Sequence, residues 1–225
     1  MTSSCSFDFS FKHLVHTVER SLKRLGTDYV DILAFHRPDP LVEYEEIAKA
    51  AAHLHKEGMV RYFGVSNHSS TQIALLQKHL DFPIVVNQLE LNLLHNYLIS
   101  SGILVNMMIA PYANTQETLE YCRLHDIMIQ AWSPVAGGQL FNESDDAPEN
   151  VRKTAALIAK YAEEKSTTRD AIALAWLLRH PMGIQPIVGT LKAHRIKDSV
   201  PADDVELSRV EWYSLLEAAR GAGVP

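Results

Sequence analysis

Short apolar segments alternate along the chain with segments of helical periodicity, and no two apolar segments are joined by a hairpin turn. Consecutive strands separated by helices are typical of parallel sheets, so this alternation predicts right-handed βαβ units. The predicted strands span residues 30–35, 61–65, 83–88, 127–133 and 186–189. The predicted helices span residues 11–25, 43–57, 69–77, 115–125, 151–165, 170–179 and 192–200, and a last one begins at residue 208.

Several helix ends carry specific signals. Gly26 follows the apolar run of the first helix and predicts its C-terminal cap. Ser69 with Gln72, and Ser208 with Glu211, have the spacing of a capping box. Thr167, three residues before Asp170, predicts the start of the helix at 170–179.

The strand at residues 30–35 is almost wholly apolar, which predicts burial on both of its faces. It is followed by His36 and then by the turn-forming sequence at residues 38–40. Ligands of α/β proteins bind at the carboxyl ends of parallel strands. His36 is therefore expected at the working face, where an imidazole can donate or accept a proton near neutral pH.

Two connections, residues 92–112 and 135–150, are longer than a passive loop in a compact domain. We expect the first to cover a site. The second contains Gly137 and Gly138 and is expected to form a lid.

Two parallel-sheet architectures fit this order of elements. One is an open doubly wound sheet of five strands, and the other is part of a (β/α) barrel, which closes with eight strands. No glycine-rich phosphate loop follows any predicted strand, which favours the barrel. The predicted fold class is α/β, a partial (β/α)8 TIM-barrel type with about five of eight units and a C-terminal helix.

Composition restricts the partners. The net charge of -6 and a pI near 6.0, without a basic stripe, argue against nucleic acid and anionic membranes, which leaves a small molecule. Cys5 and Cys122 are far apart, so neither a disulfide framework nor a thiolate metal site is expected, and a reduced cytosol is the predicted compartment. His13 and His16 lack a third ligand for a metal.

Polar or aromatic side chains end the first four predicted strands, and together they suit a planar ligand that carries a carboxamide. They are His36, Ser66, Asn67, Gln88, Trp132 and Ser133. After the fifth strand, Gly189 and Thr190 precede a helix that bears Lys192 and Arg195. A glycine, a hydroxyl, helix amides and two cations in one turn predict an anion site.

In combination, these segments resemble the aldo-keto reductases from about residue 7 to residue 225. The sequences that carry the resemblance are RLGTDYVD (24–31), HRPD (36–39), GMVRYFGVSN (58–67), NQ (87–88), WSP (132–134) and PIVGT (186–190). The resemblance implies a (β/α)8 barrel that binds NADPH across its carboxyl face and reduces an aldehyde or ketone. The implied partner is a small-molecule carbonyl substrate.

The resemblance also implies roles for individual residues. His36 matches the histidine that orients and polarises the carbonyl, and Ser66, Asn67 and Gln88 match the residues that hold the nicotinamide carboxamide. Trp132 stands where the family has a stacking tyrosine, and Ser133 and Val135 match pyrophosphate-loop positions. The implied contacts to the adenosine 2′-phosphate and adenine come from residues 189–198, namely Gly189, Thr190, Lys192, Arg195 and Asp198.

The family's first three strand-helix units have no counterpart in the 225 residues, and these units carry its catalytic aspartate, tyrosine and lysine. We expect residues 1–225 to form a single reductase-like domain that lacks them, with impaired or no activity. A non-catalytic NADP(H)-binding module and a non-functional fragment are the alternatives. Open apolar strand edges at residues 30–35 and 186–189 predict self-association.

Overall fold

The computed structural model describes residues 7–104 and 117–225. Its sheet has five strands: β1 (Val30–Phe35), β2 (Val60–Ser66), β3 (Ile84–Glu90), β4 (Met128–Trp132) and β5 (Gln185–Pro186). Their order in the sheet is their order in the sequence, and β1–β2, β2–β3 and β4–β5 pair in parallel. The predicted parallel α/β fold is confirmed. Among the described residues the sheet does not close, because β1 and β5 are its two edges.

The chain forms two compact units. The first comprises residues 1–88 and 124–127, and the second comprises residues 89–123 and 128–225. Strand β3 passes from one unit into the other, between Gln88 and Leu89. Each unit is described by itself below.

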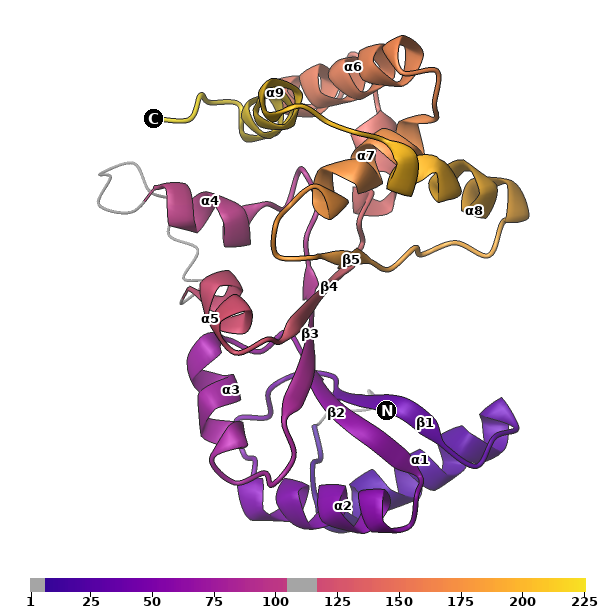
Figure 1. The fold of residues 1–225 in the computed structure, drawn as a ribbon, viewed down its shortest axis with the longest axis vertical. Helices are drawn as coiled ribbons and strands as arrows, with labels where there is room; N and C mark the ends of the chain where they lie inside the picture. Colours follow the sequence, from indigo (N-terminus) through magenta and orange to yellow (C-terminus); the bar gives the residue numbers. More distant parts are fainter. Residues whose placement is uncertain (1–6, 105–116) are drawn as a thin grey trace. The chain divides into compact units, whose positions relative to one another are not determined.

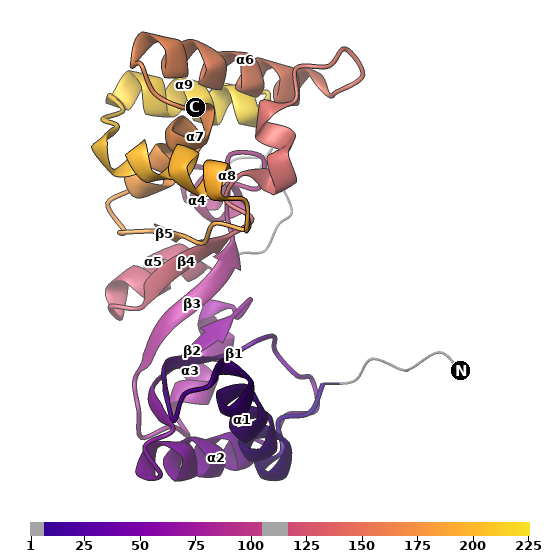
Figure 2. The ribbon, with the colours of Figure 1, turned by 90° about the vertical axis from the view of Figure 1, so that its right-hand side faces the viewer.

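The first unit contains α1 (Phe11–Leu25), α2 (Tyr44–Lys56) and α3 (Ser70–Gln77) with β1, β2 and most of β3. Helices α1 and α2 lie side by side, and α2 packs against β2 (Figures 1 and 2). Phe63 and Val65 of β2 are fully buried. Gly64 lies between them because a Cβ there would come within 2.2 Å of Val86 Cγ1 on β3. The glycine thus permits the close approach of the two strands whose carboxyl ends carry Ser66 and Gln88.

The second unit is built around α7 (Arg169–Leu178), in which seven consecutive residues, 171–177, are buried. A helix buried all round needs neighbours on every side. Its neighbours are α6 (Glu149–Glu164), α8 (Ala193–Ser199) and the 3-10 helix η2 (Val200–Asp204), and α9 (Arg209–Arg220) packs on α6 (Figure 2). The unit also contains α4 (Tyr97–Ile103), α5 (Thr118–Leu124) and the 3-10 helix η1 (Ala136–Phe141).

A tryptophan pair fixes α7 to α9. The rings of Trp176 and Trp212 stack with an interplanar angle of 10° and centroids 5.1 Å apart. Each indole N–H donates to the backbone carbonyl of the other tryptophan, at 3.2 and 2.9 Å. Both buried donors are satisfied, so the pair acts as a rigid support.

The predicted helix ends are largely confirmed. Gly26 caps α1 in the left-handed conformation, with φ 68°. The capping boxes of Ser69 with Gln72 and of Ser208 with Glu211 are both formed. The cap of α7 was predicted one residue too early, because Thr168, not Thr167, accepts the Ala171 amide.

Three other expectations were wrong. Strand β1 is not buried on both faces: only Phe35 is buried and Ile32 is 42% exposed, because an edge strand pairs on one side and has few covering elements. The connection after β3 contains helix α4, and the connection after β4 contains η1. Strand β5 has two residues and ends at Pro186, although the Ile187 amide still donates to Ala131 O at 2.8 Å. Residues 105–112 of the first connection lie outside the described residues.

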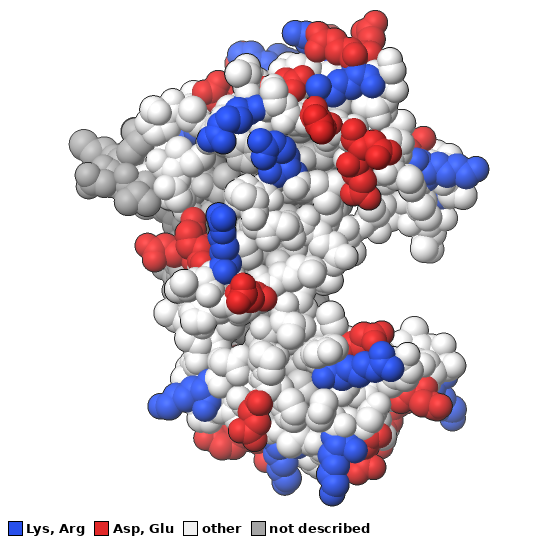
Figure 3. All heavy atoms as spheres, viewed as in Figure 1, with Lys and Arg blue, Asp and Glu red and all other residues white. Residues whose placement is uncertain are grey.

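The surface charges are mixed. On the face that Figure 3 presents, acidic and basic side chains are interspersed and form no single basic stripe. Within the described parts of the chain, no helix has the length and apolar character needed to cross a membrane.

Candidate functional site

The structure joins four predicted site residues of the first unit by hydrogen bonds. The Ser66 hydroxyl donates to Gln88 O at 2.9 Å, and the Asn67 amide N–H donates to the same carbonyl at 3.0 Å. The Asn67 side-chain Nδ2 donates to Ser66 Oγ at 2.9 Å and to His36 O at 3.3 Å. The carboxyl ends of β1, β2 and β3 are therefore linked through Asn67. We call His36, Ser66, Asn67 and Gln88 the strand-end group.

The conformation of Asn67 makes these bonds possible. Its φ of 59° places it in the left-handed region, which asparagine tolerates better than most residues. The turn directs its side chain back to β1, so that the amide bonds to the carbonyl of His36. The His36 side chain itself is exposed. Its backbone is thus held in place while its imidazole is available to a ligand.

His68 was missed as part of this region. It is 7% exposed, and its Nδ1–H donates to Ser66 O at 2.8 Å, while Asn87 Nδ2 donates to His68 O at 2.9 Å. Burial lowers the pKa of His68, and the bond to Ser66 O only partly opposes this shift. The feature of the sequence that could have identified His68 is its position directly after the predicted site residues Ser66 and Asn67. We interpret His68 as a neutral support for the turn that carries Asn67.

The residues after β4 form a second tight turn, in the second unit. Ser133 has φ 51°, and its carbonyl accepts hydrogen bonds from Asn92 Nδ2 at 3.0 Å and from the Ala136 amide at 2.9 Å. The Leu91 amide donates to Trp132 O at 3.4 Å. Asn92, which is 1% exposed, was also missed. It holds the carbonyl of Ser133 as Asn67 holds that of His36.

Val135 has a structural contact as well as its predicted place in a phosphate loop. Its side chain packs against the buried cluster of Ala171, Leu174 and Ala202. The loop that it begins continues through Gly137 and Gly138, both with positive φ. A Cβ at Gly138 would lie 3.9 Å from Arg195 Nη2, so this loop lies beside the predicted anion segment.

The predicted anion segment, residues 189–198, is exposed over most of its length. The Thr190 hydroxyl accepts the Lys192 amide at 3.2 Å, and Lys192 precedes α8 without a side-chain cap bond. Gly189 lies three residues beyond the end of β5, not at it as predicted. The segment is attached to α7, because the Thr168 hydroxyl donates to Asp198 O.

Acidic side chains lie near these cations. Burial raises the pKa of Asp170, the charge of Arg195 opposes that rise, and Asp198 adds to it. Arg195 therefore lies within electrostatic range of Asp170 at the start of α7. We call Trp132, Ser133, Val135 and residues 189–198 the loop group.

The predicted site residues thus occur in two groups, one in each unit. The strand-end group is connected by direct hydrogen bonds. In the loop group, the loop after β4 and the segment after β5 meet near Gly138 and Arg195.

Comparisons with solved structures give the same class of fold. The chain is similar to a thermostable aldo-keto reductase, Tm1743, crystallised with the inhibitor epalrestat, with a TM-score of 0.74 and 26% identity over 93% of this chain and 67% of that one. A putative 2,5-diketo-D-gluconic acid reductase B matches with a TM-score of 0.73 at 23% identity, which supports the fold alone. The class is an α/β protein related to the (β/α)8 barrels.

The family follows from the sequence comparisons. The family model described as "Aldo/keto reductase family" matches residues 1–220. The chain is 37% identical to the oxidoreductase YdhF of Escherichia coli over 95% of its length, and 38% identical to the uncharacterized oxidoreductase YcsN of Bacillus subtilis over 97%. It is 34% identical to a 6-dehydroglucose reductase of Agrobacterium fabrum. The chain belongs to the aldo/keto reductase family.

The matches cover only part of the relatives. The 225 residues span 65% of the length of YdhF and 67% of the length of YcsN. The activities by which these relatives are named are those of the relatives themselves.

Proposed function

We propose that the chain binds NADP(H) and supports hydride transfer to a small aldehyde or ketone, with low turnover as the 225-residue chain. The observation that carries the proposal is the strand-end group, in which His36, Ser66, Asn67 and Gln88 are joined at the carboxyl ends of three neighbouring parallel strands. Such ends are where ligands bind in this class of fold.

The donors present fit a nicotinamide. A carboxamide needs one hydrogen-bond acceptor and one donor in fixed directions, and the side-chain amide of Gln88 is a group that carries both. Both N–H groups of Asn67 Nδ2 already donate to Ser66 Oγ and His36 O, so Asn67 holds the turn beside Gln88. Ser66 is 4% exposed and its hydroxyl is held by two internal bonds, so its role is to fix Asn67. Trp132, half-buried at the end of β4, is the aromatic residue proposed to stack on the nicotinamide.

The loop group fits the phosphates. Lys192 and Arg195 are exposed, and no described carboxylate lies within ion-pair distance of either. Cations of this kind suit a 2′-phosphate, which NADPH has and NADH lacks. Binding is therefore expected to be stronger for NADPH than for NADH.

The chemistry needs a proton donor. When bound, NADPH supplies a hydride to the carbonyl carbon, and negative charge then develops on the substrate oxygen. His36 is the member of the strand-end group able to donate a proton to that oxygen. In the part of the chain that the structure describes, no tyrosine–lysine pair is evident beside it. Loss of a general acid typically costs a factor of about 100 or more, which supports weak turnover.

An NADPH titration followed by tryptophan fluorescence tests the proposal. Saturable quenching is expected, and Trp132→Phe should remove most of it because Trp176 and Trp212 are buried against each other. The double variant Lys192→Ala/Arg195→Ala should weaken NADPH binding by about tenfold or more and leave NADH little changed. Lys160→Ala on α6 is the matched control, since Lys160 pairs with Glu164 at 3.7 Å. Absence of quenching by either nucleotide would contradict the proposal.

A turnover assay distinguishes the proposed reductase from a nucleotide-binding module that has no catalytic activity. Consumption of NADPH with a panel of small aldehydes should be measurable and should be lost in His36→Ala. If NADPH binds and no aldehyde or ketone is reduced, the chain is a nucleotide-binding module.

A further inference from the structure

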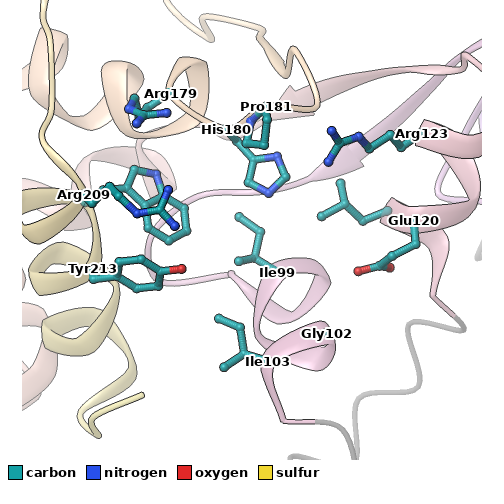
Figure 4. A pocket seen from close by; sticks show the side chains of 12 residues that line it. Ile99, Gly102, Ile103, Glu120, Arg123, Arg179, His180, Pro181, Arg209 and Tyr213 are labelled. Carbon is teal, nitrogen blue, oxygen red and sulfur yellow. The ribbon is translucent and has the colours of Figure 1, made fainter. Parts of the chain in front are cut away.

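A cavity of about 340 Å³ lies within the second unit and shares no residue with the strand-end group or the loop group. Its walls come from α4, α5, the end of α7 and the first turns of α9 (Figure 4). The volume is within the range of small-molecule pockets. None of the catalytic or cofactor roles proposed above involves it.

Three arginines give the cavity its charge. Arg123 comes from α5, Arg179 follows α7 and Arg209 begins α9, while Glu120 is the one acidic residue in the lining. Among the described residues, no carboxylate lies within 4.0 Å of a nitrogen of any of the three. Arg179 Nε is committed to Leu207 O at 3.1 Å. Among the described residues, Arg123 and Arg209 make neither an ion pair nor a side-chain hydrogen bond, so all the N–H donors of these two guanidinium groups are available to a ligand.

His180 adds a directed donor between them. Figure 4 shows its ring projecting between the side chains of Arg123 and Arg209. Its Nδ1 accepts the Met182 amide at 3.2 Å, so in the neutral imidazole the proton is on Nε2. Burial and the charge of Arg123 both lower the pKa of His180, in that order of importance, and so favour the neutral form.

The rest of the lining is apolar and rigid. Ile99 of α4, Leu119 of α5 and Trp212 of α9 are each less than 10% exposed. Trp212 is held by its stacking and its two reciprocal hydrogen bonds with Trp176. A ligand would therefore meet preformed walls, which reduces the entropy lost on binding.

We propose that this cavity binds a small organic acid, with its carboxylate between Arg123, Arg209 and His180 Nε2–H and its apolar or aromatic part against Leu119 and Trp212. Guanidinium groups suit a carboxylate because their paired N–H donors match its two oxygens. An inorganic phosphate would satisfy the arginines but leave the apolar walls without a partner. A neutral ligand would fill the walls but leave two cations unmatched.

Isothermal titration calorimetry with benzoate tests the proposal on the whole chain. Benzoate is expected to bind saturably. Benzamide, which has the same shape without the charge, and inorganic phosphate, which has charge without the ring, should each bind at least about tenfold more weakly. Equal binding of benzamide, or no saturable heat with benzoate, would overturn the proposal.

Variants locate the site. Arg123→Gln/Arg209→Gln should weaken benzoate binding by at least about tenfold, whereas Arg20→Gln, an exposed change on α1, should leave it unchanged. The near-UV circular dichroism of the Trp176–Trp212 pair reports whether the unit is intact. Ile103→Trp fills the cavity without removing a charge and should abolish binding. Wild-type affinity in both altered proteins would refute this location.

Discussion

Asn67 and Ser133 each follow a strand, and each has a positive φ, 59° and 51°. A positive φ is uncommon for non-glycine residues, although asparagine tolerates it better than serine does. Here the bonds are known: Asn67 is held by His36 O, Ser66 Oγ and Gln88 O, and the Ser133 carbonyl is held by Asn92. Each of these two turns is thus fixed by hydrogen bonds within its own unit.

Substitutions at Asn67 separate backbone strain from hydrogen bonding. Asn67→Gly removes the side-chain bonds but tolerates φ 59°, and we expect it to cost about 1 kcal/mol of unfolding free energy. Asn67→Ala loses the same bonds and adds strain, for a total of about 2 kcal/mol or more. Urea denaturation measures the difference. Both variants should bind NADPH about tenfold more weakly or worse, and unchanged binding in Asn67→Gly would remove Asn67 from the proposed cofactor site.

The buried histidines predict a pH dependence of stability. The pKa values of His68 and His180 are lowered in the folded chain, chiefly by burial, whereas the unfolded value is about 6.5. As the pH falls below about 6.5, the unfolded chain takes up protons that the folded chain does not, so stability decreases. The free energy of unfolding decreases by at most about 1.4 kcal/mol per pH unit for each histidine. This loss continues down to each folded pKa.

Urea midpoints measured between pH 7.5 and pH 5 test this dependence. His68→Gln should flatten the pH profile, and His68→Gln/His180→Gln should flatten it further. His16→Gln, an exposed change on α1, is the control. A profile that is equally steep in the double variant and in wild type would contradict the assignment.

At the scale of elements, the helix ends that could be predicted from the sequence are those set by hydrogen bonds between residues close in the chain. Gly26, Ser69 with Gln72, and Ser208 with Glu211 end or begin helices through bonds within four residues, and these predictions are confirmed. Helix α4 was missed because its end signals are incomplete: Asn96 is of a residue type that caps helices, but no capping box accompanies it and no glycine directly follows the helix. The burial of β1 was overestimated because the apolar composition of a strand does not show which elements pack against its faces.

The adjacent threonines before α7 provide a matched pair of variants. Thr168 accepts the Ala171 amide and donates to Asp198 O, so Thr168→Val should cost about 1–2 kcal/mol. The buried Thr167 hydroxyl has no hydrogen-bond partner among the described residues, so Thr167→Val should be neutral or stabilising. Thermal denaturation compares the two. Equal losses would show that Thr167 also takes part in the cap.

The two variants should differ in function as well. The hydrogen bond from Thr168 connects α7 to Asp198, the last residue of the segment that carries Lys192 and Arg195. Thr168→Val should therefore weaken NADPH binding, while Thr167→Val should not.

At the scale of the whole molecule, sites differ in how far the sequence can predict them. The strand-end group was predictable because the ends of parallel strands share one edge of the sheet, whatever the details of packing. The arginine-lined cavity was not, since Arg123, Arg179 and Arg209 come from three helices with no motif between them. Only tertiary packing brings those side chains together.

The open edges of the sheet predict self-association. Strand β1 pairs with β2 alone among the described strands, and its Ile32 and the neighbouring Tyr62 are 42% and 54% exposed. An unpaired edge with apolar side chains is a template for another strand, and Asp31 and Arg61 are charged but neutralise each other across 2.7 Å. Sedimentation velocity from about 1 to 100 μM should show an increasing sedimentation coefficient. Ile32→Lys places an unmatched charge on this edge and should suppress the increase, whereas Leu41→Lys, at a loop position that is 87% exposed, should not. A coefficient independent of concentration would mean that the β1 edge is protected in solution.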